Sequence, residues 1–143
     1  LPSHIHIFTH IILVTAGLNT DPYPSQSIYS NLIKSAHDIS LGGIITAVSK
    51  MCIKGNKGIN LKKPKYLINE MEYFFAEDQG RYIVEIDKKD FKKVTEILNK
   101  NAVHFDELGS IIKNELYIND KTKVTIDELK SSNTRWLKEY MSN

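Results

Sequence analysis

A run of fifteen residues, KSAHDISLGGIITAV at positions 34–48, constrains the fold more than any other part of the sequence. It combines a short alternating segment, an acidic residue, a serine suited to a helix N-cap and two glycines ahead of a helical pattern. We expect a strand to end at Asp38 and a helix to begin after Ser40. Such a turn leaves the backbone N–H groups of Leu41, Gly42 and Gly43 without partners in the helix, which is the geometry of an anion site.

Two interpretations of this turn are open. Because glycine has no Cβ, a phosphate or a carboxylate can approach the backbone closely, and Asp38 beside it can hold a divalent cation. In the simpler interpretation, Ser40 only caps a helix and the two glycines only make a tight turn between strand and helix. The local pattern favours the simpler interpretation, because single short motifs are weak indicators of function.

The composition is that of an ordinary globular protein. The 143 residues are 41% hydrophobic and include 19 basic and 17 acidic side chains, a net charge of +2. So small a net charge argues against nucleic acid as a partner. The most apolar run, residues 11–18, is far shorter than the roughly 20 residues that span a bilayer. The single cysteine, Cys52, falls in an apolar helical pattern and indicates a reducing compartment, so we expect a cytosolic protein that binds neither nucleic acid nor membrane.

The N-terminal segment predicts a strand. β-branched residues dominate positions 4–16, as is typical of strands. His4, His6 and His10 share one face of that strand, but no carboxylate or cysteine follows at a ligand spacing, so we expect ordinary histidines and no metal site there. Two prolines within residues 19–25 predict a turn, followed by a short helix that leads into the next strand.

The remainder of the chain alternates between helix and strand patterns. Helical periodicity predicts helices after Gly43, at 66–73, at 88–100 and from Leu129 to Met141, the last opened by a capping box of Thr125 and Glu128. Alternation predicts strands at 82–86, 103–112 and 115–118, the last two as a hairpin across Lys113-Asn114, and a short edge strand at 123–126.

This order predicts an α+β domain of α/β layers, in which helices pack on one face of a mixed sheet. We expect residues 1–27, a divergent strand and turn, and residues 28–143 to form one domain.

Two segments carry a family resemblance, SAHDISLGGIITAVSKM at 35–51 and FFAEDQGRYIVEI at 74–86. The first resembles an A-H-D-x-S-D-G-G turn before a helix, and the second resembles an F-F/G-E-x-Q-x-R strand start further along the chain. Both are typical of the C-terminal domain of the aminoimidazole ribonucleotide synthetase superfamily. The match is closest to the large subunit of phosphoribosylformylglycinamidine synthase, which ends in a helix carrying a tryptophan. The resemblance covers residues 28–143.

The resemblance implies the fold of that domain and the chemistry of a complete enzyme. That enzyme converts formylglycinamide ribonucleotide to the amidine with ATP and glutamine-derived ammonia, through an iminophosphate. The implied cofactors are Mg²⁺ and ATP or ADP. The implied partners are the remaining synthase domains, a glutamine amidotransferase subunit and a small accessory subunit, and a homodimer is also allowed. Selenophosphate synthetase, hydrogenase maturation factors and thiamine-monophosphate kinase belong to the same superfamily, but the second segment and the tryptophan-bearing helix favour the synthase.

The resemblance also implies roles for particular residues. Asp38 matches a magnesium-binding carboxylate at a nucleotide site. The turn on the phosphate side of that site is matched by His37, Ser40, Gly42 and Gly43. A second motif, to which the resemblance assigns only packing or contact between domains, is matched by Glu77, Gln79 and Arg81.

Two departures from the family pattern bear on activity. Leu41 stands where the family has a second aspartate, which removes a charge that helps to hold a metal. Residues 19–26 replace the family's glycine-rich segment, and the family's ATP-binding domain and catalytic histidine are missing upstream. We therefore expect no catalytic residue in this chain and no activity from the chain alone. The alternative is a non-catalytic interaction domain, or a decayed gene product, that keeps the fold and has lost the site.

Overall fold

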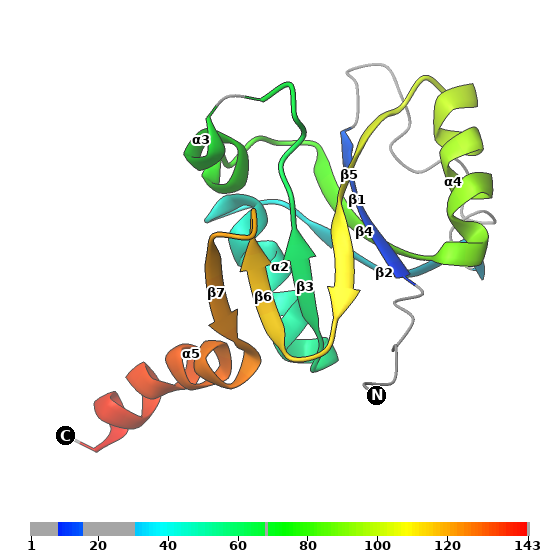
Figure 1. Cartoon of the computed structure of the whole chain (residues 1–143). Helices are drawn as coiled ribbons and strands as arrows, with labels where there is room; N and C mark the ends of the chain where they lie inside the picture. Colours follow the sequence, from blue (N-terminus) through cyan, green and yellow to red (C-terminus); the bar gives the residue numbers. More distant parts are fainter. Residues whose placement is uncertain (1–8, 16–30, 68, 143) are drawn as a thin grey trace.

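The structure is a computed structural model, and it describes residues 9–15, 31–67 and 69–142 (Figure 1). The elements in chain order are β1 Thr9–Thr15, β2 Ile33–Asp38, α2 Gly43–Gly55, β3 Gly58–Leu61, α3 Glu70–Phe75, β4 Arg81–Asp87, α4 Lys88–Lys100, β5 His104–Ile112, β6 Glu115–Ile118, β7 Thr122–Thr125 and α5 Ile126–Met141. His4, His6 and the turn predicted at 19–25 lie outside the described residues, as does most of the short helix predicted after that turn.

A mixed sheet of seven strands organises the described part of the chain. The strand order is β2-β4-β1-β5-β3-β6-β7. Neighbouring strands are antiparallel except β3 and β6, which are parallel. β1 is hydrogen-bonded on both sides, to β4 and to β5. The predicted α+β class with a mixed sheet is therefore confirmed.

The hairpin predicted across residues 113–114 is wrong, because β3 lies between β5 and β6. The connection from β5 to β6 crosses the start of β3 at Gly58, where a Cβ would lie 2.1 Å from the Glu115 carbonyl oxygen. The hairpin that does form joins β6 to β7. Its loop contains Asn119 and Asp120, which both adopt positive φ, a conformation that Asn and Asp tolerate better than most residues. β7 is the predicted edge strand.

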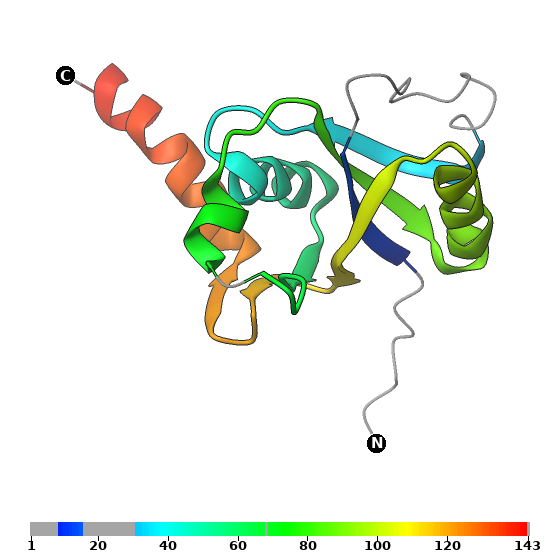
Figure 2. The ribbon, with the colours of Figure 1, turned by 90° about the horizontal axis from the view of Figure 1, so that it is seen from above.

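Helices cover both faces of the sheet, whereas the sequence analysis predicted helices on one face. Alternate residues of β1 enter two separate clusters, since Ile11 and Leu13 pack with α2 while Ile12 and Val14 pack with α4. Figure 2 shows α2 and α4 on opposite sides of β1 and β4. A strand buried on both faces is continuously apolar, and this explains the unbroken apolar run at the start of the chain.

Two helices have the bounds or the start that the sequence predicted. α4 spans residues 88–100. α5 begins at the predicted capping box, in which the Thr125 hydroxyl accepts from the Glu128 N–H (3.2 Å) and the Glu128 carboxylate accepts from the Thr125 N–H (2.8 Å). Within the described residues, every helix is too short or too polar to cross a membrane.

Candidate functional site

The turn between β2 and α2 brings together the predicted site residues. β2 ends at Asp38, and the buried Ile39 follows, whose N–H donates to the Arg81 carbonyl oxygen (2.9 Å). Gly42 (φ 81°) and Gly43 (φ 66°) then adopt left-handed conformations in succession. Glycine takes this conformation without steric cost, so the pair reverses the chain and α2 begins at Gly43.

Ser40 is not the helix cap that the sequence analysis predicted. The N-cap position of α2 is Gly42, a residue without a side chain to cap the helix. Ser40 is exposed, and its carbonyl oxygen accepts a hydrogen bond from the Gly43 N–H (3.0 Å). A tight backbone turn therefore takes the place of a side-chain cap.

A carboxylate of the chain itself lies at the N-terminus of α2. Glu77, in the loop after α3, accepts a hydrogen bond from the Gly42 N–H at 2.8 Å. Its negative charge meets the positive end of the helix dipole, the place that one of the two interpretations of the sequence assigned to an external anion. Since the Gly43 N–H donates to Ser40, both glycine N–H groups have partners within the chain. A phosphate can reach the Gly42 N–H only when Glu77 moves away.

The end of α3 packs directly against this turn. A Cβ at Gly43 would lie 2.7 Å from the Phe75 carbonyl carbon and 2.8 Å from the Phe74 carbonyl oxygen, closer than Cβ atoms approach backbone. The two sequence segments that carry the family resemblance are therefore in contact. We call residues 38–43 and 74–81 together the joint.

Arg81 holds the loop that carries Glu77. The residue is 8% exposed, and its Nη1 lies 2.7 Å from Asp78 Oδ2. The guanidinium also lies 5.8 Å above the centre of the Tyr73 ring, a cation–π contact. A buried charge is costly unless it is paired, so this ion pair fixes the loop conformation.

The sequence analysis gave Glu77, Gln79 and Arg81 no role beyond packing or contact between domains. In the structure Glu77 contacts Gly42 and Arg81 pairs with Asp78, while the exposed side chain of Gln79 makes no such contact among those described. Glu77 and Gly42 are 35 residues apart, and no local pattern links residues at such a separation. The pairing of the two motifs in the family resemblance was the signal that connected them.

Asp38 presents its carboxylate to solvent. The side chain is 69% exposed, and one of its oxygens lies 3.5 Å from His37 Nδ1. His37 Nδ1 also donates to the Asp38 carbonyl oxygen (2.6 Å). Mg²⁺ in proteins commonly uses one or two carboxylates together with water and substrate phosphates, and Asp38 fits one such position. Among the residues that the structure describes, no three His, Cys, Asp or Glu side chains gather as a metal site, so a metal at Asp38 would need further ligands from a nucleotide, water or another domain.

His37 also lines a cleft of about 430 Å³ between α2 and the sheet, whose lining includes neither Asp38 nor the glycines of the turn. Ser35 Oγ donates to Glu85 Oε2 (2.7 Å) on one wall of this cleft. Cys52 lies on another wall, and burial raises the pKa of its thiol to about 12. The thiol is therefore protonated at neutral pH and unreactive.

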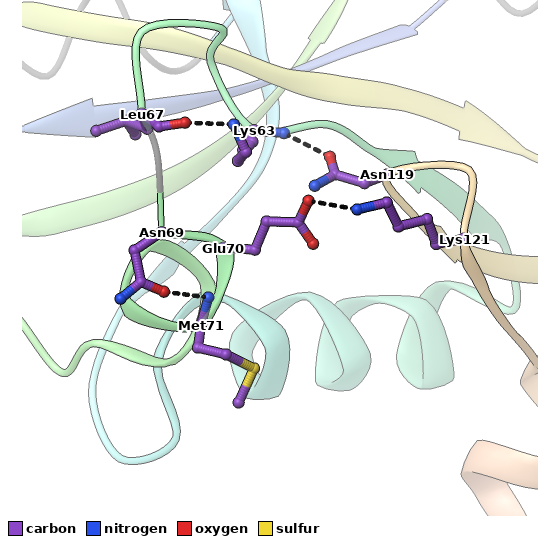
Figure 3. Close-up of polar contacts among 7 residues, drawn as sticks. All are labelled: Lys63, Leu67, Asn69, Glu70, Met71, Asn119 and Lys121. Carbon is purple, nitrogen blue, oxygen red and sulfur yellow. Dashed lines mark hydrogen bonds and ion pairs between the residues drawn. The ribbon is translucent and has the colours of Figure 1, made fainter.

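Polar contacts anchor α3, whose last two residues begin the second half of the joint (Figure 3). Asn69 caps α3 by accepting two N–H groups of its first turn (3.1 and 3.2 Å). Lys121, from the β6–β7 loop, lies 3.0 Å from the Glu70 carboxylate. In the same loop, the side-chain oxygen of Asn119 accepts from the Lys63 N–H (2.9 Å). Because Asn69 sets the start of α3, the helix begins later than the sequence predicted.

Comparison with known proteins gives the family. Residues 24–121 match the family model described as AIR synthase related protein, C-terminal domain. Curated relatives include the phosphoribosylformylglycinamidine synthase subunit PurL of Pelagibacter ubique, 63% identical over 116 residues, which are 81% of this chain and 16% of the relative. The PurL subunit of Bartonella henselae is 34% identical over 114 residues, 80% of this chain and 15% of the relative. The chain thus spans less than a fifth of the length of these relatives.

Solved structures share the fold. PurL of Thermotoga maritima complexed with ATP superposes with a TM-score of 0.66 at 21% identity, over 85% of this chain and 25% of that chain. Thiamine-monophosphate kinase of Stenotrophomonas maltophilia gives a TM-score of 0.61 at 9% identity, over 79% of this chain and 50% of that chain. With the family model matching more than half of its residues, the chain belongs to the AIR synthase related protein family, whose C-terminal domain it contains.

Proposed function

We propose that this chain is a domain of the large subunit of a phosphoribosylformylglycinamidine synthase, an enzyme of purine biosynthesis. The complete enzyme amidates formylglycinamide ribonucleotide with ATP and glutamine-derived ammonia. The observation that carries the proposal is the 63% identity to the Pelagibacter ubique subunit over 116 residues. Structures of Thermotoga maritima PurL with ATP, ADP and AMPPCP support a nucleotide-dependent reaction.

In this proposal the chain contributes to an active site and forms none alone. It spans 16% of the length of the Pelagibacter ubique relative, so most groups that bind ATP and the ribonucleotide belong to the rest of the enzyme. The proposed partners are the remaining synthase domains, a glutamine amidotransferase subunit and a small accessory subunit, and the Thermotoga maritima PurLQS structure supports such an assembly. We also propose that residues 1–27 and 28–143 form one domain, which is supported by the place of β1 between β4 and β5, and that the enzyme is cytosolic.

Within the same proposal, Asp38 binds Mg²⁺ and the turn faces the nucleotide phosphates through His37, Ser40, Gly42 and Gly43. The exposed Asp38 carboxylate supports the metal role. A bound Mg²⁺ would neutralise phosphate charge during phosphoryl transfer. Glu77 has to release the Gly42 N–H before a phosphate can take its place.

A chimera tests the proposed function. The segment of the Pelagibacter ubique subunit that matches this chain is replaced by the corresponding residues of this chain, and ATP-dependent amidation is measured with formylglycinamide ribonucleotide and ammonia. We expect turnover by the chimera and none by the 143-residue chain alone. Robust turnover by the chain alone, or a folded chimera without activity, would contradict the proposal.

The alternative of a non-catalytic interaction domain is favoured by Leu41, an exposed apolar residue where the family has an aspartate. Calorimetry with Mg-ADP on the chimera and its Asp38→Ala variant separates the two functions. Binding that is lost in Asp38→Ala supports a retained nucleotide site. Absence of binding in both proteins supports the interaction domain.

A further inference from the structure

α5 begins inside the domain and ends outside it. Ile126 is buried, and Leu129 packs against the core on the α2 side of the sheet. Every residue from 131 to 142 is exposed. Figures 1 and 2 both show this second half of the helix projecting from the body of the domain.

After the polar residues 130–135, the end of the projecting half again carries apolar side chains on the face that the first half directs to the core. Trp136, Leu137, Tyr140 and Met141 are 64%, 46%, 77% and 76% exposed. Trp136 and Tyr140 follow Leu129 at seven and eleven residues, spacings that return to the same face of an α-helix. We call these four residues the α5 stripe.

The other side of the projecting half is polar. Arg135 and Glu139 form an exposed i,i+4 pair at 3.7 Å, and Thr134 and Lys138 are also exposed. Single exposed apolar residues are normal on protein surfaces, but a contiguous set on one helix face marks an interaction surface. The stripe includes the single tryptophan of the chain, a residue type enriched at the centres of interfaces.

The size of the stripe indicates the kind of partner. Its exposed side chains offer on the order of 500 Å², given that an aromatic side chain buries about 150–250 Å². A stable complex of separate proteins commonly buries about 800 Å² on each partner, so pairing of two copies through the stripe alone is too small. Interfaces between domains of one chain are as small as about 600 Å² in total, and covalent linkage raises the effective concentration to the mM range.

We infer that the α5 stripe docks in an apolar groove on another domain of the synthase polypeptide. This groove lies next to the point where α5 leaves the core of the present domain. The inference rests on the proposed function, because the occupant is the rest of a subunit of which this chain spans 16% in the Pelagibacter ubique relative. The stripe lies on the same helix face as the buried Ile126 and the partly buried Leu129, which places the groove beside the core edge.

Hydroxyl-radical footprinting tests the inference, because Trp, Tyr and Met side chains in contact with solvent are readily oxidised. Oxidation at Trp136 and Tyr140 is compared between the 143-residue chain and the chimera described above. We expect oxidation roughly tenfold slower in the chimera, since residues at an interface centre are desolvated. Equal oxidation in both proteins would overturn the inference.

Variants supply a second readout. We expect the double variant Trp136→Ser, Tyr140→Ser to lower the Tm of the chimera by roughly 4 °C and to leave the Tm of the isolated chain unchanged. The matched control is Arg135→Ala, Glu139→Ala on the polar side of the helix, where the exposed ion pair of these residues contributes little, and it should change neither protein. Equal Tm values for the chimera and its stripe variant would also overturn docking.

Varying the concentration of the isolated chain shows whether the stripe instead binds a second copy of the same chain. Protection of Trp136 that increases with concentration of the isolated chain, together with dimers in sedimentation, would overturn the inference in favour of self-association. The amidation activity of the chimera tests the proposed function separately. An active chimera with an exposed stripe overturns docking alone, and an inactive chimera with a protected stripe overturns the function while the contact stands.

Discussion

The joint and the projecting half of α5 differ in whether groups of the same domain contact them. At the joint, the two glycine N–H groups that resemble an anion site have hydrogen-bond acceptors in the chain itself, since Gly42 donates to Glu77 and Gly43 donates to Ser40. In α5, the apolar face of residues 131–141 is left uncovered by the domain. The glycine N–H groups of the joint therefore already have acceptors in the isolated domain, whereas α5 needs a partner.

This difference shows that a pattern typical of a ligand site can serve packing, and that a pattern typical of core packing can remain exposed. Glycines, an acidic residue and a helix N-terminus suggest a ligand, but here they also satisfy the packing of α3 against α2. The amphipathic C-terminal pattern suggests ordinary core packing, but only its first turn enters the core. Substitutions at the joint should therefore change the stability of the isolated chain, and substitutions in the stripe should not.

The largest effect is expected at Gly43. Gly43→Ala combines a positive φ with a Cβ less than 3 Å from the backbone of Phe74 and Phe75, and we expect a loss of about 3 kcal/mol or more in the free energy of unfolding. The measurement is urea unfolding of the isolated chain. The matched control is Gly55→Ala at the other end of α2, where a Cβ meets nothing within 4 Å. Equal losses at both positions would show that α3 does not require Gly43.

An intermediate effect is expected at Glu77. Glu77→Ala removes a charged acceptor at a helix N-terminus, so we expect a loss of about 1 kcal/mol, with roughly half of that for Glu77→Gln, which keeps an acceptor. The control is Glu96→Ala, because the exposed ion pair of Glu96 with Lys92 is long at 3.9 Å and contributes little. A Glu77→Ala variant as stable as Glu96→Ala contradicts the capping role.

A smaller, pH-dependent effect is expected at the start of α5. Hydrogen bonds from the Thr125 N–H and hydroxyl hold the pKa of the Glu128 carboxyl below its usual value of 4.5. Because the folded-state pKa is the lower one, this stabilisation is present above pH 4.5 and is lost as the pH falls through the folded-state pKa. We expect circular dichroism to show a loss of helix in that range, and Glu128→Gln to lack this component. Identical pH profiles would rule out the capping box as its cause.

The smallest effect is expected for the stripe in the isolated chain. Trp136→Ser removes a side chain that is 64% exposed, so we expect the free energy of unfolding to change by less than about 0.5 kcal/mol. Urea unfolding measures this value. A loss comparable to that of Gly43→Ala would mean that α5 folds back onto its own domain in solution.

Local patterns predicted the elements whose causes are local. Helical periodicity predicted α4 at its observed bounds, and the spacing of Thr125 and Glu128 predicted the start of α5. Strand order was not predictable in this way, because the position of β3 between β5 and β6 depends on a crossing at Gly58 that no neighbouring residue signals. The sequence analysis did not predict helices on the second face of the sheet. It did not take the continuous apolar run of β1 as a sign that this strand is buried on both faces.

The sequence predicted which residues belong to the candidate site, but it did not predict the contacts between them. The sequence located the turn and the glycines, and the family resemblance added the second motif. The sequence did not show that Glu77 bonds to Gly42, because contacts across 35 residues are set by the packing of α3 on α2. Ser40 was mistaken for the cap since the pattern did not show two successive left-handed glycines. The roles of Asp38 and His37 toward a nucleotide stay predictions.

Amide hydrogen exchange at Gly42 tests most directly whether the two motifs form one joint closed by Glu77. We expect the Gly42 N–H of the native chain to exchange slowly and that of the Glu77→Ala variant to exchange roughly tenfold faster, because the N–H loses its partner. The Gly43 N–H, which donates to Ser40, should keep its rate in both proteins and serves as the internal control. Equal exchange rates at Gly42 in the two proteins would contradict the closure of the α2 N-terminus by Glu77.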